Sequence, residues 1–591
     1  MGRFFRDQVG DRWYNIPMAY IKRFEFENGS LEDIRGLKHN ENQIGEKWPV
    51  VYVINDEERA YVGQTTDIHN RTSQHLRNPK KQSMTEIRII TDDDYNVSVA
   101  LGLEAFLIQH INADRKYRLI NGTRGNSAHN YYNRKKYEDE FRVVWEELRK
   151  LGVAQYTLEE LENSEIFKYS PFKTLGDEQV EAELNIIRAF AGNDTGKGTR
   201  VIIRGGAGTG KTVLAVYLMK LFADIRAWQL EPEDYEDDYL DLDQTFIYAY
   251  ENIKGLDKIG IVFPQKSLQT SMKDVFGHVQ ALDPSMVLNT NGVVDNYLRT
   301  GEKYDLLIVD EAHRLKSRNR GGNMLANKGF NDRCSKLGLD SNTASELDWI
   351  LMCSRNQIIF RDDRQTVRAA DMDAEEFNRV SGKYDDGVTM DRLLSAQWRC
   401  KGGRDYTDYV KSIMDCTATA FREVENYDFR LYDDVGQMVE DIKDLERKYR
   451  LCRVGAGYAW KWKTKKDPNA WDIEIGDDRF RWNSTYDNWI ARNAVDEIGC
   501  IHTLQGYDLN YVGVIIGNDI RYDKETGSIA ADKTNYYDTL GKTGVADDPE
   551  ALKEYLVNIY VTLMTRGIRG TYVYACDPDL REYLERFIPK A

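Results

Sequence analysis

The sequence predicts an α/β protein built from more than one domain. Its 591 residues are too many for a single hydrophobic core of ordinary size. Short apolar strands alternate with helices over most of the length, which is typical of doubly wound, mostly parallel sheets. One of these strands runs through a glycine-rich turn directly into a helix. Together the three observations favour a small α/β domain followed by two larger lobes with parallel sheets.

The composition is that of a folded protein rather than of one that spans a membrane or coats a nucleic acid. Apolar residues make up 41% of the chain, and no run is long enough to cross a bilayer. The net charge of −16 argues against non-specific binding along a nucleic acid, although a basic groove would still bind one. The seven cysteines include no CxxC pair, so neither a zinc site nor a disulfide framework is expected. Without a signal-peptide pattern at the N-terminus, we expect a cytoplasmic protein.

The apolar pattern divides the chain into five segments. They are residues 1–47, an extension without assignment; 48–134, the small α/β domain; 135–170, a helical linker; 171–385, the first lobe; and 386–591, the second lobe. Within the first lobe, most residues of Glu231–Asp243 are acidic, which predicts a solvated insertion.

Individual elements follow from periodicity and apolar runs. In the small domain we expect strands over Val50–Ile54 and Ala60–Gly63 and a helix over Val99–Ile111. In the linker, five apolar side chains recur at helical spacing and predict a packed helix: Phe141, Val144, Trp145, Leu148 and Leu151. In the two lobes the expected strands are Val201–Arg204, Gly260–Phe263, Leu306–Val309, Gln357–Phe360, Val512–Ile516 and Gly570–Tyr574, with a helix over Val213–Leu221.

The most specific motif is a complete G-x-x-x-x-G-K-[ST] between a strand and a helix. Its residues are Gly205, Gly206, Ala207, Gly208, Thr209, Gly210, Lys211 and Thr212. The glycines let backbone N–H groups surround phosphates at a helix N-terminus. Lys211 is expected to reach the β- and γ-phosphates, and Thr212 to ligate Mg²⁺. The sequence therefore predicts a nucleotide site.

An acidic pair supports the same site from another strand. The apolar strand Leu306–Val309 ends in Asp310, Glu311, Ala312 and His313. A carboxylate pair at the carboxyl end of a buried strand is suited to hold Mg²⁺, through Asp310, and to polarise the attacking water, through Glu311.

From Phe172 to the C-terminus the chain resembles the superfamily 1 helicases, which implies ATP, Mg²⁺ and two RecA-like lobes. Gln179 ends a segment that resembles the adenine-reading motif, and Asp362 and Gln365 resemble the D-x-x-Q that senses the γ-phosphate. Three later segments resemble the fourth, fifth and sixth motifs of the superfamily, in the same order: Gln397–Arg399, His502–Asp508 and Tyr560–Arg566. The combined set is most similar to the Schlafen-group helicase-like domain of bacteria.

Two arginines complete this resemblance from the second lobe. Arg399 corresponds to an arginine that faces the phosphates, and Arg566 to an arginine finger. An arginine supplied only when the lobes close would couple hydrolysis to movement, because charge accumulates on the transferred phosphoryl oxygens.

Two further segments leave alternatives open. Tyr458–Lys466 interleaves aromatic and basic residues, which suits either a groove that stacks single-stranded nucleic acid or a half-buried strand with a lysine-rich turn. Arg318–Gly322 is either a mobile basic loop or an ordinary surface loop.

From Val50 to Tyr132 the chain resembles the GIY-YIG nuclease family. Val50-Val51-Tyr52 stands at the first triplet, without its glycine, and Tyr61-Val62-Gly63 at the second. Arg71, His75, Glu104 and Asn121 then follow in the order of the family.

The resemblance implies a role for each of these residues. Tyr61 or Tyr52 takes a proton from the attacking water, and Arg71 binds the scissile phosphate with a bidentate fork. Glu104 ligates a catalytic Mg²⁺ or Mn²⁺. His75 contacts the phosphate or relays a proton, and Asn121 positions the helix that carries the metal ligand.

Taken together, the sequence predicts an ATP-dependent enzyme that processes nucleic acid, with a helicase-type motor behind a metal-dependent endonuclease. The nucleic acid is expected to be DNA rather than RNA, and phage defence or repair would suit the combination. An oligomer or a protein partner from a defence system is compatible with it. The alternative is a nucleic-acid-stimulated ATPase, a remodeller or sensor, whose N-terminal domain binds without cutting.

Overall fold

The computed structural model describes most of the chain as two compact units. The residues described are 19–121, 131–162, 164–173, 175–193, 197–206, 208–227, 244–253, 255–317, 324–362, 372, 374–384, 388–394, 401–467, 469–483, 496–504, 509–538, 541–542 and 548–591, with the backbone of 3–6 and 13–16. One unit contains Met1–Gly192, Val213–Ile261 and Thr270–Val287, and the other contains Asn193–Thr212, Val262–Gln269 and Leu288–Ala591. Within these described ranges, no helix is long and apolar enough to cross a membrane.

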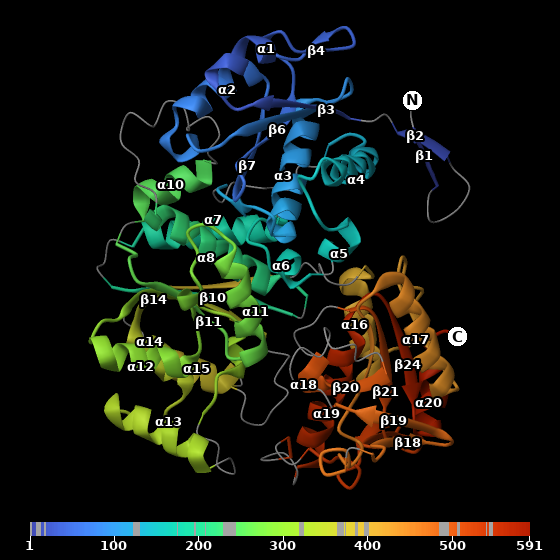
Figure 1. Ribbon diagram of the computed structural model, residues 1–591. Coiled ribbons are helices and arrows are strands. Elements are labelled where there is room, and N and C mark those ends of the chain that lie inside the picture. Colours follow the sequence, from blue (N-terminus) through green and yellow to red (C-terminus); the bar gives the residue numbers. More distant parts are fainter. Residues whose placement is uncertain are drawn as a thin grey trace. The chain divides into compact units, whose positions relative to one another are not determined.

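A five-stranded sheet forms the N-terminal part of the first unit (Figure 1). Its order is β3-β8-β6-β7-β9, with bounds Tyr20–Glu25, Glu86–Thr91, Val50–Asn55, Arg59–Thr65 and Arg118–Leu119. The antiparallel hairpin of β6 and β7 confirms the two predicted strands and places Tyr52 opposite Gly63. β3 pairs with β8, so part of the unassigned segment 1–47 belongs to this sheet.

Helices cover this sheet and one another. α3 (Val97–Asp114) packs against β6 and β7, as the apolar pattern predicted, and α2 (Ile68–Arg77) precedes it in the chain. Three helices of the expected linker contact α3: α4 (Arg134–Lys150), α5 (Leu158–Glu162) and α6 (Glu165–Lys168). The apolar stripe of α4 is buried as predicted, except that Leu151 lies past the end of the helix and is exposed. The linker is therefore packed onto the domain that it follows.

The first lobe contains a six-stranded sheet of order β12-β11-β13-β14-β10-β15. The bounds in this order are Val287–Leu288, Ile259–Val262, Tyr304–Val309, Ser354–Arg361, Thr199–Gly205 and Val388–Leu394. β10 pairs in parallel with β14 and β15, and β13 pairs in parallel with β14. Four of these strands match the predicted ones, and each contains a short buried run of apolar residues, as expected for strands with both faces covered. β15 extends the sheet beyond the expected lobe boundary at residue 385.

Helices of this part of the chain alternate with the strands. Their bounds are Asp177–Ala191 (α7), Lys211–Ala227 (α8), Gln244–Asn252 (α10), Lys266–Gly277 (α11), Thr290–Thr300 (α12), Met324–Lys336 (α13), Glu346–Cys353 (α14) and Ala374–Gly382 (α15). The acidic stretch Glu231–Asp243 and the basic stretch Arg318–Gly322 lie outside the described residues.

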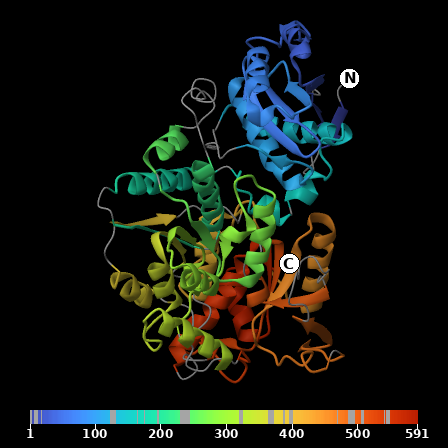
Figure 2. The same ribbon diagram turned by 60° about the vertical axis from the view of Figure 1, so that its left-hand side comes forward.

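The second lobe contains a seven-stranded sheet of order β16-β24-β21-β17-β20-β19-β18. The bounds in this order are Asp428–Leu431, Gly567–Ala575, Leu509–Ile516, Cys452–Ala456, Glu497–Cys500, Asp478–Trp482 and Ile473–Ile475. Its pairs are parallel up to β19, and β18 is antiparallel to β19. Its helices are Gly403–Met414 (α16), Val435–Tyr449 (α17), Ile501–Leu504 (α18), Pro549–Met564 (α19) and Pro578–Leu584 (α20), and they flank the strands (Figures 1 and 2).

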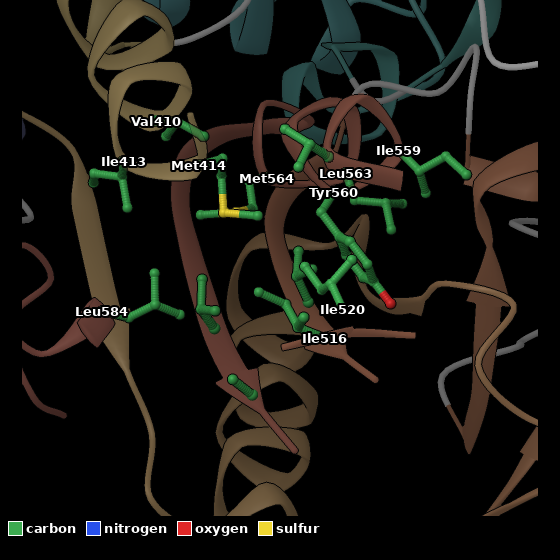
Figure 3. Packing of buried hydrophobic residues seen from close by; sticks show 14 of the residues in the cluster. Val410, Ile413, Met414, Ile516, Ile520, Ile559, Tyr560, Leu563, Met564 and Leu584 are labelled. Carbon is green, nitrogen blue, oxygen red and sulfur yellow. The ribbon is translucent and has the colours of Figure 1, made fainter. Parts of the chain in front are cut away.

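A buried apolar cluster holds the second lobe together (Figure 3). Val410, Ile413 and Met414 of α16 meet Leu563 and other side chains of α19 in this cluster, together with the end of β21. Burial of this apolar surface is the main stabilising contribution to the lobe. Two helix-flanked, mostly parallel sheets confirm the predicted RecA-like fold class.

Tyr458–Lys466 forms a loop after β17 rather than a strand, so the strand alternative is wrong. Trp462 is half-buried with its ring edge-on to that of Trp482, whereas the lysines of the loop are exposed. Lys463 pairs with Glu474. The loop turns because Thr464 donates its N–H and its hydroxyl to the buried Asp472.

Candidate nucleotide site and candidate nuclease site

The glycine-rich turn joins the end of β10 to the start of α8. Gly208 and Gly210 have φ values of +78°, a left-handed conformation that other residues adopt only with strain. Thr209 donates its hydroxyl to the carbonyl of Gly206 at 3.0 Å, which closes the turn. The predicted motif therefore has the backbone that a phosphate-binding loop requires, although Ala207 lies outside the described residues.

Lys211, at the first position of α8, points back into this turn. It is 5% exposed, and its Nζ donates to the carbonyl oxygens of Gly205 at 2.7 Å and Gly206 at 2.8 Å. The Oδ2 atom of Asp362, at the end of β14, lies 3.7 Å from the same Nζ. The ammonium group is thus held at the loop, where a phosphate would compete with the two carbonyls for it.

Thr212 and Asp310 meet as the sequence predicted. The Thr212 hydroxyl donates to Asp310 Oδ2 at 2.7 Å, and Asp310 donates its N–H to the carbonyl of Val262. Asp310 is fully buried, and its Oδ1 atom has no hydrogen-bond partner among the described residues. Burial, together with the negative charge of Glu311, raises the pKa of Asp310 to about 6. A hydroxyl beside a carboxylate with an unpartnered oxygen fits Mg²⁺, which prefers hard oxygen ligands and keeps others from phosphates or water.

Glu311 is held by the two residues that follow it in the motif. Its backbone φ is +51°, and its Oε2 atom lies 3.1 Å from His313 Nε2 and 3.2 Å from Arg314 Nε. Burial opposes ionisation of this carboxyl, but its hydrogen bond with His313, together with Arg314 and Lys211, brings its pKa well below the usual value. Glu311 is therefore ionised, as a group that orients water must be.

His313 connects Glu311 to Asp362, a link that the sequence analysis missed. Asp362 donates its N–H to His313 Nδ1 at 3.2 Å, so Nδ1 is the acceptor and the proton resides on Nε2, facing Glu311. His313 is 1% exposed. Its place next to an acidic pair was visible in the sequence, but its partner at the end of another strand was not.

The remaining residues predicted for the motor divide into two groups. Gln365 and Arg399 lie outside the described residues, as do Gln397 and Gln505–Asp508 of the neighbouring motifs. Gln179 is buried, and its Oε1 atom accepts the N–H of Gly176, which caps α7. Arg566 is buried just after α19, and its carbonyl accepts the N–H of Leu509. The predicted contacts of these residues with nucleotide stay predictions.

A second cluster of predicted residues surrounds Tyr52 in the N-terminal sheet. Tyr52 Oη lies 2.8 Å from His75 Nε2 and accepts from Arg71 Nε at 3.3 Å. Both partners come from one face of α2, and all three side chains are buried. The Tyr61 ring lies 5.2 Å from the His75 ring, centroid to centroid. The structure thus brings together four of the six residues predicted for the nuclease.

Glu104 and Asn121 lie on neighbouring elements. Glu104 is on the buried stripe of α3, the helix that packs against β6 and β7, and it is 9% exposed. Asn121 is fixed to β7, because its side chain accepts the N–H and donates to the carbonyl of Val62. Among the described residues there is no group of three His, Cys, Asp or Glu that could hold a metal ion. A metal at Glu104 would therefore need further ligands from phosphate and water, which Mg²⁺ accepts.

Comparison with known protein families decides which family the motor belongs to. A family model of the Schlafen group 3 DNA/RNA helicase domain matches residues 199–577, more than half of the chain. The chain belongs to this family. The Schlafen group 3 match begins where β10 begins and includes Lys211, Asp310, Glu311 and Arg566. The resemblance of the motor to a Schlafen-group helicase is confirmed, whereas the nuclease resemblance concerns residues outside the match and stays a prediction.

Individual relatives of this Schlafen group 3 chain are distant. An uncharacterized protein of Saccharomyces cerevisiae is 27% identical over 421 residues, which cover 65% of this chain and 83% of that protein. Two solved structures resemble the fold at low TM-scores. A chain from the Saccharomyces cerevisiae complex of Dbp5 with Nup159, Gle1 and ADP is 12% identical, with a TM-score of 0.29, covering 73% of this chain and 91% of that one. The Pif1 helicase from Bacteroides, solved with ADP-AlF3 and single-stranded DNA, is 11% identical, with a TM-score of 0.26, covering 71% and 95%.

Proposed function

We propose that this chain is an ATP-driven motor on nucleic acid whose N-terminal domain cleaves a phosphodiester bond. The observation that carries the first half is the convergence of Lys211, Thr212, Asp310 and Glu311 at the carboxyl ends of β10 and β13. The observation that carries the second half is the buried contact of Tyr52 with Arg71 and His75. DNA is the proposed substrate of both activities, in a setting of phage defence or repair.

In the motor, each side chain has a distinct task. Lys211 leaves its loop carbonyls to bind the β- and γ-phosphates, and Thr212 and Asp310 hold Mg²⁺, which neutralises phosphate charge when bound. Glu311 orients the attacking water, with His313 fixing its carboxylate. Arg399 and Arg566 supply positive charge from the second lobe.

The test of the motor is the rate of ATP hydrolysis with and without added DNA or RNA. Lys211→Ala should abolish hydrolysis, and Glu311→Gln should keep ATP bound while turnover falls by several orders of magnitude, roughly 10³-fold or more. Lys266→Ala, which removes a lysine at the start of another helix, serves as the control. Normal rates in both motif variants would exclude this site.

In the proposed nuclease, Tyr52 takes the proton of the attacking water, and Arg71 binds the phosphate beside it. Glu104 holds a divalent metal, which stabilises the leaving oxygen when bound. Asn121 keeps the strand next to the metal helix in position. These roles are supported by the short distances around Tyr52 and by the packing of α3 on β6 and β7.

The test of the nuclease is cleavage of labelled DNA and RNA by the full chain with Mg²⁺ or Mn²⁺. Glu104→Gln and Arg71→Ala should each eliminate cleavage and leave ATP hydrolysis unchanged, because the motor residues lie elsewhere in the chain. Absence of cleavage by the wild type on every substrate would favour the alternative, a nucleic-acid-stimulated ATPase that remodels or senses its substrate. Retained cleavage in Glu104→Gln would exclude Glu104 as the metal ligand.

A further inference from the structure

A lysine that belongs to none of the predicted motifs lies inside the Tyr52 cluster. Lys81 is 5% exposed, and its Nζ lies 2.7 Å from Nδ1 of His75. The same Nζ lies 3.4 Å above the centre of the Tyr61 ring. The lysine therefore touches two residues of the proposed nuclease site at once.

The chain holds Lys81 in place through a short turn after α2. Asn78 ends the helix by donating its N–H to the carbonyl of His75, and its side chain accepts the N–H of Lys80. Lys81 is the last residue of this turn, η2 (Pro79–Lys81), and donates its own N–H to the carbonyl of Asn78. Because the turn is tied directly to the helix that carries His75, the two side chains have a fixed relative position.

The direction of the hydrogen bonds follows from the chemistry of lysine. An ammonium group has three donors and no acceptor, so His75 Nδ1 must be the acceptor of the bond with Lys81. A neutral imidazole with a bare Nδ1 carries its proton on Nε2, and Nε2 is the atom that faces Tyr52 Oη. Tyr52 Oη is then the acceptor of two hydrogen bonds, from His75 Nε2–H and from Arg71 Nε–H.

We propose that Lys81 is a positioning residue that fixes His75 in the Nε2–H tautomer and so makes Tyr52 the proton acceptor of the site. This inference rests on the proposed nuclease function. Two hydrogen bonds donated to a phenol oxygen favour its deprotonated form, which is the form that can accept a proton from water. If Lys81 were absent, either ring nitrogen of His75 could carry the proton, and Tyr52 could donate to His75 instead.

The same geometry separates the two tyrosines that the sequence left as alternatives. Tyr61 presents its ring face to the Lys81 ammonium, and an aromatic face attracts a cation through its quadrupole. That attraction, with the bond to His75, offsets the cost of burying a charge. The Tyr61 ring therefore binds the Lys81 ammonium, whereas Tyr52 is the tyrosine whose oxygen accepts the proton.

The first experiment determines the tautomer of His75 without measuring cleavage. Nitrogen-15 labelling of the eight histidines of the full chain, with His75→Gln to assign the signal, shows which ring nitrogen of His75 bears the proton. We expect the Nε2–H form in the wild type and a mixture, or the Nδ1–H form, in Lys81→Met. An Nδ1–H form in the wild type, or an unchanged tautomer in Lys81→Met, would overturn the inference.

The second experiment measures cleavage with matched variants. Lys81→Met should lower kcat on the order of 10-fold to 100-fold, a part of the roughly 10²- to 10⁴-fold typical of a positioned general base, with little change in KM. Lys81→Arg, which keeps a donor and a cation, should restore part of the loss. Lys80→Met removes the exposed neighbouring charge and should leave kcat unchanged. Unchanged ATP hydrolysis and unchanged circular dichroism in all three variants would show that each one folds.

The two experiments separate the failure of this inference from the failure of the proposed nuclease. A wild-type protein that cleaves nothing, together with a tautomer that depends on Lys81, would overturn the nuclease and leave the hydrogen-bond assignment standing. A wild-type protein that cleaves, together with an unaltered tautomer and kcat in Lys81→Met, would overturn the role of Lys81 alone.

Discussion

Replacing Asp519 by asparagine is expected to stabilise the second lobe at pH 8 and to destabilise it at pH 4. Asp519 is fully buried between β21 and β22 (Ile520–Asp523). Its Oδ1 atom accepts the hydroxyl of Tyr560, a residue of α19 that Figure 3 shows within the core, and its Oδ2 atom has no hydrogen-bond partner among the described residues. Burial is the largest influence on this carboxyl and raises its pKa from 3.8 to about 7, although the Tyr560 hydrogen bond acts in the opposite direction.

The sign and size of the effect follow from the difference between the pKa of Asp519 in the unfolded chain and its pKa in the folded chain. Below pH 4 Asp519 is protonated in both the folded and the unfolded chain, so burial of its charge costs nothing. Between pH 4 and 7 the unfolded chain releases the proton while the folded chain retains it, and the free energy of unfolding falls as pH rises. The interval from 3.8 to about 7 corresponds to roughly 4 kcal/mol, which is lost by pH 8.

Asparagine does not titrate, so the variant lacks this pH dependence of the free energy of unfolding. It instead lowers that free energy by an amount that is the same at every pH and smaller than the loss in the wild type at pH 8. Its amide oxygen can still accept from Tyr560, but its NH₂ group would replace Oδ2 without an acceptor, which costs about 1–3 kcal/mol at every pH. The variant should therefore be more stable than the wild type by about 1–3 kcal/mol at pH 8 and less stable by a similar amount at pH 4.

The assay is urea-dependent hydrogen exchange of the amides of β21 and β24, compared between variant and wild type at each pH. Because hydrogen exchange measures the opening of individual amides in the second lobe, it does not assume that a chain with several domains unfolds in one step. Asp477→Asn, at an exposed turn, is the matched control and should shift nothing. A difference between Asp519→Asn and the wild type that stays constant from pH 4 to pH 8 would refute the reasoning.

Three further predictions concern the two sites. Gly63→Ala should reduce cleavage at least 10-fold, since the added Cβ would collide with the hydroxyl of Tyr52 on the paired strand; full cleavage would exclude a role for this strand pair. His313→Ala should lower kcat for ATP on the order of 10-fold with little change in KM, because the Glu311 carboxylate loses the group that fixes it; an unchanged kcat in steady-state ATPase assays would exclude this role of His313. Arg399→Ala and Arg566→Ala should each lower kcat on the order of 10³-fold with ATP affinity retained, and rapid hydrolysis in both variants would contradict their assignment to the phosphates.

The strands of the motor were predictable because each contains a short run of consecutive apolar residues. The apolar runs of β13 and β14 are buried on both faces of the sheet, which requires this pattern, and the acidic residue that follows β13 stands out. Asp310 was predicted in this way, and Asp362 through the resemblance to the D-x-x-Q motif. The P-loop was equally visible, because only glycine adopts the left-handed backbone of Gly208 and Gly210 without strain.

Edge strands were less predictable because polar residues interrupt their apolar ones and because they depend on a partner. β3 was left in an unassigned segment, and it becomes a strand by pairing with β8 across more than sixty positions of sequence. β15 lies beyond the predicted boundary at residue 385 for a similar reason: Asp391 and Arg392 interrupt its apolar residues, and only the register with β10 makes it part of the first lobe.

The sequence by itself determined the phosphate-binding loop, the acidic pair and the Schlafen-group motor, and it supplied the residue types that the proposed nuclease would use. The tertiary structure decided which of these residues act together. His313 reaches Asp362, and Lys81 reaches the ring of Tyr61, through contacts that no fixed sequence spacing encodes. The physical reason is that a motif records the local backbone, which a few residues specify, whereas a hydrogen bond between distant elements depends on the packing of the whole sheet that carries them.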